Sequence, residues 1–179
     1  IPRKATITDI GCGYGQMSFM LGLLSPERTI LGIDYDEDKI ELANNSFLRK
    51  KTNTNFKCAD MTTVEIPMSD AILFNDSLHY VNADAQKDIL SRAAQSLNEG
   101  GIIVVRDGDV SQTDKHEKIK TTEKWSTEII KFNKTTTDLT FVSAEWMRSF
   151  AETNGLEIKI RKCDNDSSET LYILTKTRL

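Results

Sequence analysis

The chain has 179 residues, of which 39% are apolar and 28% are charged, which is ordinary for one globular domain. Its formal net charge of −4 argues against nucleic acid as the main partner, because neutralising phosphates requires clustered Lys and Arg. The cysteines Cys12, Cys58 and Cys163 lack metal-ligand spacing, and no apolar run approaches the ~20 residues of a membrane span, so we expect a cytoplasmic protein without a membrane span.

The first 105 residues alternate between apolar runs typical of buried strands and segments with helical apolar spacing. The expected strands are 6–10, 29–34, 55–59, 70–75 and 102–105, and the expected helices are 16–24, 36–50 and 83–98. Near-continuous apolar strands that alternate with helices indicate a parallel, doubly wound sheet with helices on both faces.

The pattern changes in the last third of the chain. Residues 111–140 form a polar insert, in which Trp125, Ile129 and Phe132 are either lid residues or the apolar face of a surface helix. A last helix begins with Ser143 as its cap, and strands at 156–161 and 170–175 predict an antiparallel hairpin. The expected fold is an α/β domain over 1–179, with seven strands, mostly parallel.

A glycine-rich loop lies between the first strand and the first helix. It reads Asp9-Ile10-Gly11-Cys12-Gly13-Tyr14-Gly15, and its glycines allow a sharp turn and the close approach of a ligand. The following helix offers free N–H groups to that ligand. Asp34 ends the second strand, where a carboxylate can accept hydrogen bonds from both hydroxyls of a ribose. This combination predicts a nucleoside-binding site.

The finer spacing distinguishes between nucleoside cofactors. The dinucleotide motif is G-x-G-x-x-G, but Gln16 stands where its third glycine would be. Asp9 precedes the loop, and a carboxylate there favours a ligand with a cationic amine and a sulfonium over one with phosphates. An NAD(P)-dependent oxidoreductase is therefore the alternative and not the leading interpretation.

Several stretches resemble the class I S-adenosylmethionine-dependent methyltransferases, which have a Rossmann-like fold. The matching stretches are 7–15, 32–36, 58–61, 71–80 and 97–102. The resemblance implies S-adenosylmethionine as the cofactor. The cofactor-binding residues that it implies are Asp9, Gly11, Cys12, Gly13, Tyr14, Gly15, Asp34, Tyr35, Asp60, Met61 and Asn75.

The resemblance also implies which part of the cofactor each residue contacts. The glycine loop would line the methionine part, and Asp9 would hold the amine. Asp34 would bind the ribose, and Tyr35 would pack on the adenine. Asp60 would accept a hydrogen bond from the adenine amino group with Met61 beside it, and Asn75 would face the sulfonium.

Methyl transfer from a sulfonium needs a base only where the acceptor must lose a proton. His79 is the first candidate because an imidazole titrates near neutral pH, although it could equally cap a helix or pack on the pocket rim. Tyr80 and Asp76 are the next candidates. Asp107 and Asp109 suit a hard cation, but no third ligand can be assigned, so we expect no metal.

The predicted activity is methyl transfer to an O, N or C atom of a small-molecule or lipid-like acceptor by in-line displacement. A non-catalytic nucleoside-binding module of a larger protein is a further alternative. Relatives of this kind carry one or two helices before the first strand, whereas only five residues precede Thr6 here. We therefore expect a domain truncated at its N-terminus or excised from a longer chain, whose other domains are candidate partners.

Overall fold

The computed structural model describes residues 1–108, 139–163 and 169–177. The expectations for Asp109, for most of the polar insert with Trp125, Ile129 and Phe132, and for the loop at 164–168 lie outside the described residues.

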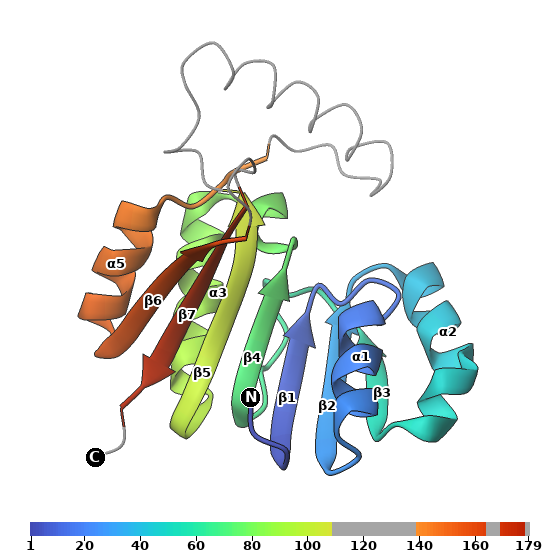
Figure 1. Cartoon of the computed structure of the whole chain (residues 1–179). Coiled ribbons are helices and arrows are strands. Elements are labelled where there is room, and N and C mark those ends of the chain that lie inside the picture. The colour runs from blue at the N-terminus through green and yellow to red at the C-terminus, as the bar shows by residue number, and fades with distance from the viewer. Residues whose placement is uncertain (109–138, 164–168, 178–179) are drawn as a thin grey trace.

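The described residues form one sheet of seven strands in the order β3-β2-β1-β4-β5-β7-β6 (Figure 1). The strands are β1 (Ala5–Ile10), β2 (Arg28–Asp34), β3 (Thr54–Cys58), β4 (Ser69–Asn75), β5 (Leu97–Gly108), β6 (Leu156–Lys162) and β7 (Glu169–Lys176). The first five strands pair in parallel, and β7 is antiparallel to both of its neighbours. The predicted, mostly parallel seven-stranded sheet with an antiparallel C-terminal pair is confirmed.

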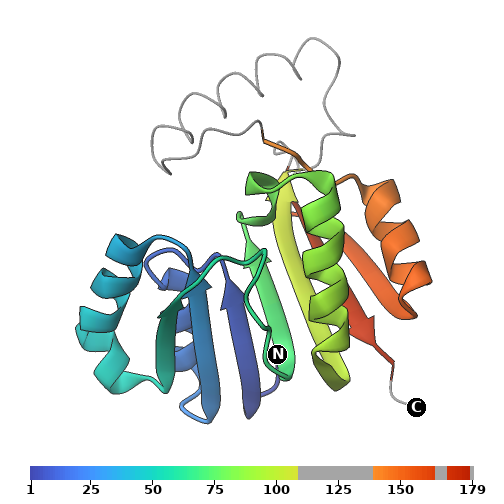
Figure 2. The ribbon, with the colours of Figure 1, turned by 180° about the vertical axis from the view of Figure 1, so that it is seen from behind.

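Helices cover both faces of this sheet (Figures 1 and 2). The α-helices are α1 (Gln16–Leu24), α2 (Glu37–Asn45), α3 (Ala83–Gln95) and α5 (Ala144–Thr153), and two short 3₁₀ helices are η1 (Phe47–Lys51) and η2 (Leu78–Tyr80). None of these described helices combines the length and the apolar character that crossing a membrane requires.

Alternate residues of β4 supply the two layers of the core. Ala71 and Leu73 pack with Met17 of α1 on one face. Ile72 and Phe74 pack on the other face, in the cluster that contains the apolar residues of α3 and α5. This alternation follows from the two-residue period of a strand, and it explains why β4 is apolar throughout.

Two helix ends differ from the sequence-based expectation. Helix α2 ends at Asn45 and not near Lys50, because Ser46 leaves the helical conformation. The Ser46 hydroxyl then caps η1 by accepting a hydrogen bond from Leu48 N. Helix α3 ends at Gln95 and not at Asn98, because Leu97 already pairs with Ser69 in the sheet.

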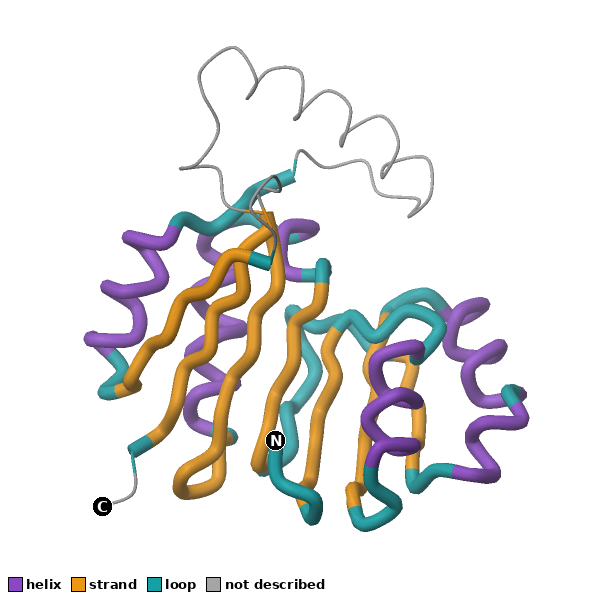
Figure 3. The backbone as a smooth tube through the Cα atoms, in the orientation of Figure 1, coloured by secondary structure: helices purple, strands orange, loops and turns teal. Residues whose placement is uncertain are grey.

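The connections after β1, β2 and β4 meet at one edge of the sheet (Figure 3). Strand β1 lies between β2 and β4, so the chain runs outward to β3 on one side and returns to the other side for β4. This reversal leaves a crevice at the carboxyl ends of the strands, which is where α/β sheets bind ligands.

Candidate functional site

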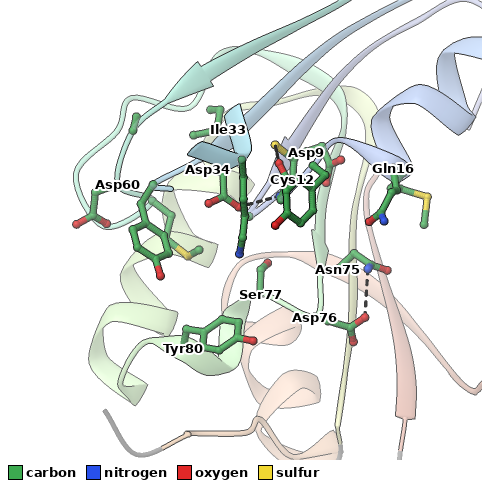
Figure 4. A pocket seen from close by; sticks show the side chains of 18 of the residues that line it. Asp9, Cys12, Gln16, Ile33, Asp34, Asp60, Asn75, Asp76, Ser77 and Tyr80 are labelled. Carbon is green, nitrogen blue, oxygen red and sulfur yellow. Dashed lines mark hydrogen bonds between the residues drawn. The ribbon is translucent and has the colours of Figure 1, made fainter. Parts of the chain in front are cut away.

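A pocket of about 640 Å³ occupies this crevice (Figure 4). Its lining comes from the ends of β1, β2 and β4 and from the segments that follow β3 and β4. The lining residues are Asp9, Gly11, Cys12, Gly13, Tyr14, Gln16, Met17, Met20, Ile33, Asp34, Tyr35, Lys39, Ala59, Asp60, Met61, Thr62, Asn75, Asp76, Ser77, Tyr80 and Val81.

The glycine loop forms one wall of the pocket and leads directly into α1. Gly15 is the N-cap of α1 at φ 78°, and a Cβ there would lie 2.5 Å from the ring of Phe56. No side chain caps this helix, and Gln16 and Met17 of its first turn line the pocket. The first turn of α1 therefore offers its backbone N–H groups toward a ligand, as the sequence suggested.

Asp34 fixes the shape of the loop from the end of β2. Its Oδ2 accepts a hydrogen bond from Gly13 N at 2.8 Å, and its Oδ1 accepts one from Asp36 N at 3.0 Å. Asp36 in turn caps α2 by accepting from the N–H groups of Asp38 and Lys39. The buried Asp34 carboxylate thus holds two loops together while it lines the pocket.

Asp9 is a second buried carboxylate in the lining. The pKa of Asp9 is raised to about 6, mainly by burial; the hydrogen bond from Ser18 Oγ lowers it, and the charge of Asp34 adds to the rise. That hydrogen bond is 2.6 Å long and ends on Asp9 Oδ2. Burial likewise raises the pKa of the Cys12 thiol far above its usual range, so Cys12 is a neutral thiol in this wall.

The wall across from the glycine loop comes from the end of β4 and the segment that follows it (Figure 4). Ser77 Oγ donates to Ile10 O at 2.8 Å and ties this segment to the end of β1. Asp76 accepts hydrogen bonds from Asn75 Nδ2 and from Arg106 Nη1. Burial raises the pKa of Asp76, the Arg106 charge opposes this, and the charges of Asp107 and Glu169 add to it.

His79 is not one of the lining residues. Its side chain is 1% exposed, and its ring lies 4.3 Å from the Tyr80 ring, centroid to centroid. Its Nδ1 lies 2.7 Å from Asp107 Oδ1, which also accepts a hydrogen bond from Gly108 N. A carboxylate only accepts, so we assign the imidazole proton to Nδ1. The buried Nε2 has no hydrogen-bond partner in the described part of the chain.

The pocket brings together most of the residues predicted from the sequence. All of the eleven predicted cofactor-binding residues except Gly15 line the pocket. Two of the three predicted catalytic residues, Asp76 and Tyr80, also line it, and His79 does not. His79 instead lies next to the lining residue Tyr80.

Sequence reasoning missed several lining residues, of which Lys39 is the most informative. Lys39 Nζ lies 3.8 Å from Asp36 Oδ2 and 5.8 Å from the centre of the Tyr14 ring. The position of Lys39, three residues after the helix cap Asp36, was the signal that could have placed it near the end of β2. The other missed lining residues are Gln16, Met17, Met20, Ile33, Ala59, Thr62, Ser77 and Val81.

A metal centre has no candidate within the described ranges, where no three His, Cys, Asp or Glu side chains come together. Asp107, which the sequence suggested as a ligand, is engaged with His79 and Gly108.

Residues 7–101, more than half of the chain, match the family model of the methyltransferase domain. The chain belongs to this family. The family assignment agrees with the arrangement of the glycine loop, Asp34 and the carboxyl ends of β1, β2 and β4 around one pocket.

Individual relatives are distant. Carboxy-S-adenosyl-L-methionine synthase of Campylobacter concisus is 27% identical over 104 residues, which cover 58% of this chain and 44% of that protein. O-methyltransferase 3 of Dictyostelium discoideum is 27% identical over 112 residues, which cover 59% of this chain and 26% of that protein. This methyltransferase domain thus matches half or less of the length of each of these relatives.

A solved structure shows the same fold over nearly the whole chain. Human N-acetylserotonin methyltransferase in complex with S-adenosylmethionine superposes with a TM-score of 0.72 at 15% identity. The superposition covers 96% of this chain and 47% of the human protein.

Proposed function

We propose that this methyltransferase domain binds S-adenosylmethionine in the pocket and transfers its methyl group to a small-molecule or lipid-like acceptor. The donor carbon is already activated by the sulfonium, so in-line positioning of the acceptor supplies much of the acceleration. In well-oriented reactions, such positioning lowers the activation barrier by about 7–11 kcal/mol.

The charge of the pocket is the observation that carries this proposal. Among the described lining residues, Asp9, Asp34, Asp60 and Asp76 are acidic, and Lys39 is basic. Such a lining attracts a ligand with a sulfonium and an ammonium group and repels a pyrophosphate. The same observation argues against the NAD(P)-dependent alternative.

The roles that we propose for the lining residues follow the cofactor from one end to the other. We assign Asp9 to the amine and Asp34 to the ribose. Both carboxylates line the pocket near the ends of two neighbouring parallel strands, so they can contact adjacent parts of one ligand. Tyr35 and Met61 pack on the adenine. Asp60 Oδ1 accepts hydrogen bonds from Thr62 N and Oγ1, so Oδ2 is the oxygen that we assign to the adenine amino group.

The methyl group would lie toward Asn75 and Asp76, at the end of β4. A carboxylated methyl group would bring an anion next to Asp76, whereas Lys39, the basic lining residue, follows β2. We therefore propose methyl transfer for this chain, although several relatives, among them the Campylobacter concisus protein, are named for the synthesis of carboxy-S-adenosylmethionine. O-methyltransferase 3 of Dictyostelium discoideum is named as a methyltransferase.

Calorimetric titration with S-adenosylmethionine, its demethylated product S-adenosylhomocysteine and NADPH tests the proposal. We expect the first two to bind and NADPH to give no heat. In Asp34→Asn, the affinity for S-adenosylhomocysteine should fall at least tenfold, because a charged acceptor is lost both for the ribose and for Gly13 N. Glu37→Gln, which removes an exposed carboxylate from the first turn of α2, is the matched control.

NADPH binding without S-adenosylhomocysteine binding would contradict the proposal. Tight cofactor binding without release of S-adenosylhomocysteine from S-adenosylmethionine across a panel of amines, phenols and fatty acids would favour the non-catalytic module.

A further inference from the structure

We propose that Asp76 recognises an amine nitrogen of the methyl acceptor and stabilises the positive charge that this nitrogen gains. The inference rests on the proposed function and narrows it from methyl transfer in general to methyl transfer to nitrogen.

The backbone of Asp76 is strained at the pocket wall. Its φ is +53°, and no other described residue apart from glycine has a positive φ. Such a conformation costs on the order of 1–3 kcal/mol and persists where the surrounding structure imposes it. At Asp76 it places a carboxylate immediately after the last residue of β4, in the lining of the pocket.

Neighbouring side chains hold one oxygen of this carboxylate. Asp76 Oδ2 accepts hydrogen bonds from Arg106 Nη1 and Asn75 Nδ2, and Asp76 N donates to Arg106 O at 2.9 Å. The other oxygen, Oδ1, is buried and has no hydrogen-bond partner in the described part of the chain. An unpaired buried acceptor costs about 1–3 kcal/mol. The Asp76 side chain as a whole is 35% exposed, so an ammonium group in the pocket would be attracted by the charge of this carboxylate.

Within the described ranges, the negative charge around Asp76 is not balanced by positive charge. Arg106 also donates, through Nη2, to Glu169 Oε2 of β7, so one guanidinium serves two carboxylates. The group of Asp76, Arg106 and Glu169 therefore carries a net negative charge. Asp9, Asp34 and Asp60 already have roles toward the cofactor, so the charge of Asp76 is available to the acceptor.

The choice between nitrogen and oxygen follows from the chemistry of the two acceptors. An uncharged amine attacks the methyl carbon with its lone pair; the C–N bond forms, and the C–S bond breaks with its electron pair returning to sulfur. The positive charge thereby moves from sulfur to nitrogen, and the amine keeps its proton during the transfer. A carboxylate fixed next to that nitrogen stabilises the charge as it develops.

A hydroxyl acceptor would instead have to lose its proton. The imidazole of His79 does not line the described pocket, and its Nδ1 is engaged with Asp107. The lining that the structure describes is therefore better suited to an amine, whose ammonium form can lose its proton to solvent before it attacks, so that no protein base is needed during the transfer.

Titration of three matched probes into the protein loaded with S-adenosylhomocysteine tests this inference. The probes are benzylamine, benzyl alcohol and benzoate, which share a ring that suits the side chains of Tyr80 and Val81 in the lining. We expect benzylamine to bind at least tenfold more tightly than benzoate. In Asp76→Asn, the affinity for benzylamine should fall at least tenfold, whereas the affinity for benzyl alcohol should change less than twofold.

The variant is chosen to preserve the fold. Asn adopts a positive φ as readily as Asp, and Asp76→Gly, which relieves the strain, is the second variant. Glu41→Gln removes an exposed carboxylate on α2 and should leave the binding of all three probes unchanged. The affinity for S-adenosylhomocysteine should stay within twofold in every variant.

Benzoate binding as tight as benzylamine, or benzylamine binding that survives both substitutions at Asp76, would overturn the inference. Failure of the unmodified protein to bind S-adenosylhomocysteine would instead overturn the proposed function. The same titrations on the unliganded protein would then decide whether Asp76 binds amines.

Discussion

Asp9 lies at the end of β1, buried next to a second carboxylate, and this position couples protein stability to pH. Its pKa is raised from 3.8 to about 6, mainly by burial, so the folded protein holds a proton that the unfolded chain releases between these two values. The free energy of unfolding should therefore fall as the pH rises from about 4 to about 6. A shift of this size corresponds to about 3 kcal/mol.

Asp9→Asn should remove this pH dependence, because the amide does not titrate and can still accept the hydrogen bond from Ser18 Oγ. Urea unfolding should show equal stability for the two proteins near pH 4 and a gain of up to about 3 kcal/mol for the variant at pH 7. The variant should also bind S-adenosylhomocysteine more weakly, since the amine loses its carboxylate. Equal pH profiles for the two proteins would show that Asp9 does not titrate in this range.

Side-chain direction limits what a sequence can reveal about single residues. Asp34 was predictable, because the last residue of a parallel strand next to a glycine loop faces the ligand edge of the sheet. His79 and Tyr80 are adjacent in sequence, but the turn η2 directs Tyr80 into the pocket and His79 toward Asp107. Asp107, the partner of His79, is 28 residues away in the sequence, so no local sequence pattern predicts their contact.

The glycine loop is the element on which the pocket depends, and two of its glycines serve different needs. A Cβ at Gly15 would lie 2.5 Å from the Phe56 ring, whereas a Cβ at Gly13 would have nothing within 4 Å. Both residues have positive φ, so Ala is strained at either position, by about 1–2 kcal/mol. The steric clash is added only at Gly15.

Gly15→Ala should therefore destabilise the domain more than Gly13→Ala. We expect a loss of about 1–2 kcal/mol for Gly13→Ala and at least about 1 kcal/mol more for Gly15→Ala, because Phe56 belongs to a packed cluster with Phe19 and Ile40. Urea unfolding of the two variants at one pH measures the difference. Equal losses would mean that the Phe56 ring moves aside freely.

Element boundaries were predicted less well than the elements themselves. Leu97 continues the apolar spacing of α3 and was therefore assigned to that helix, but it pairs with Ser69 as the start of β5. Its side chain is fully buried there, as it would also be on the inner face of a helix. Burial alone therefore cannot separate the two assignments, and the pairing with β4 that decides them lies between residues distant in the sequence.

At the scale of the whole molecule, the mostly parallel seven-stranded sheet with its antiparallel C-terminal pair was the most predictable property, because apolar strands that alternate with helices have few arrangements in a parallel sheet. The pocket joins both halves of that sheet, since its walls come from β1 and β2 on one side and from β4 on the other. A ligand that contacts both walls should stabilise the domain as a single cooperative unit.

Thermal unfolding with S-adenosylhomocysteine checks this expectation. A ligand present at 100 times its Kd stabilises a folded protein by about 2.7 kcal/mol, which corresponds to a rise in Tm of about 5–10 °C for a domain of this size. The transition should stay single and shift as a whole, because unfolding of either half destroys the pocket. A transition that splits on ligand addition would show that the two halves unfold separately. An equal rise in Tm with NADPH would show that the pocket does not select for a cationic nucleoside, since the acidic lining should repel the phosphates of NADPH.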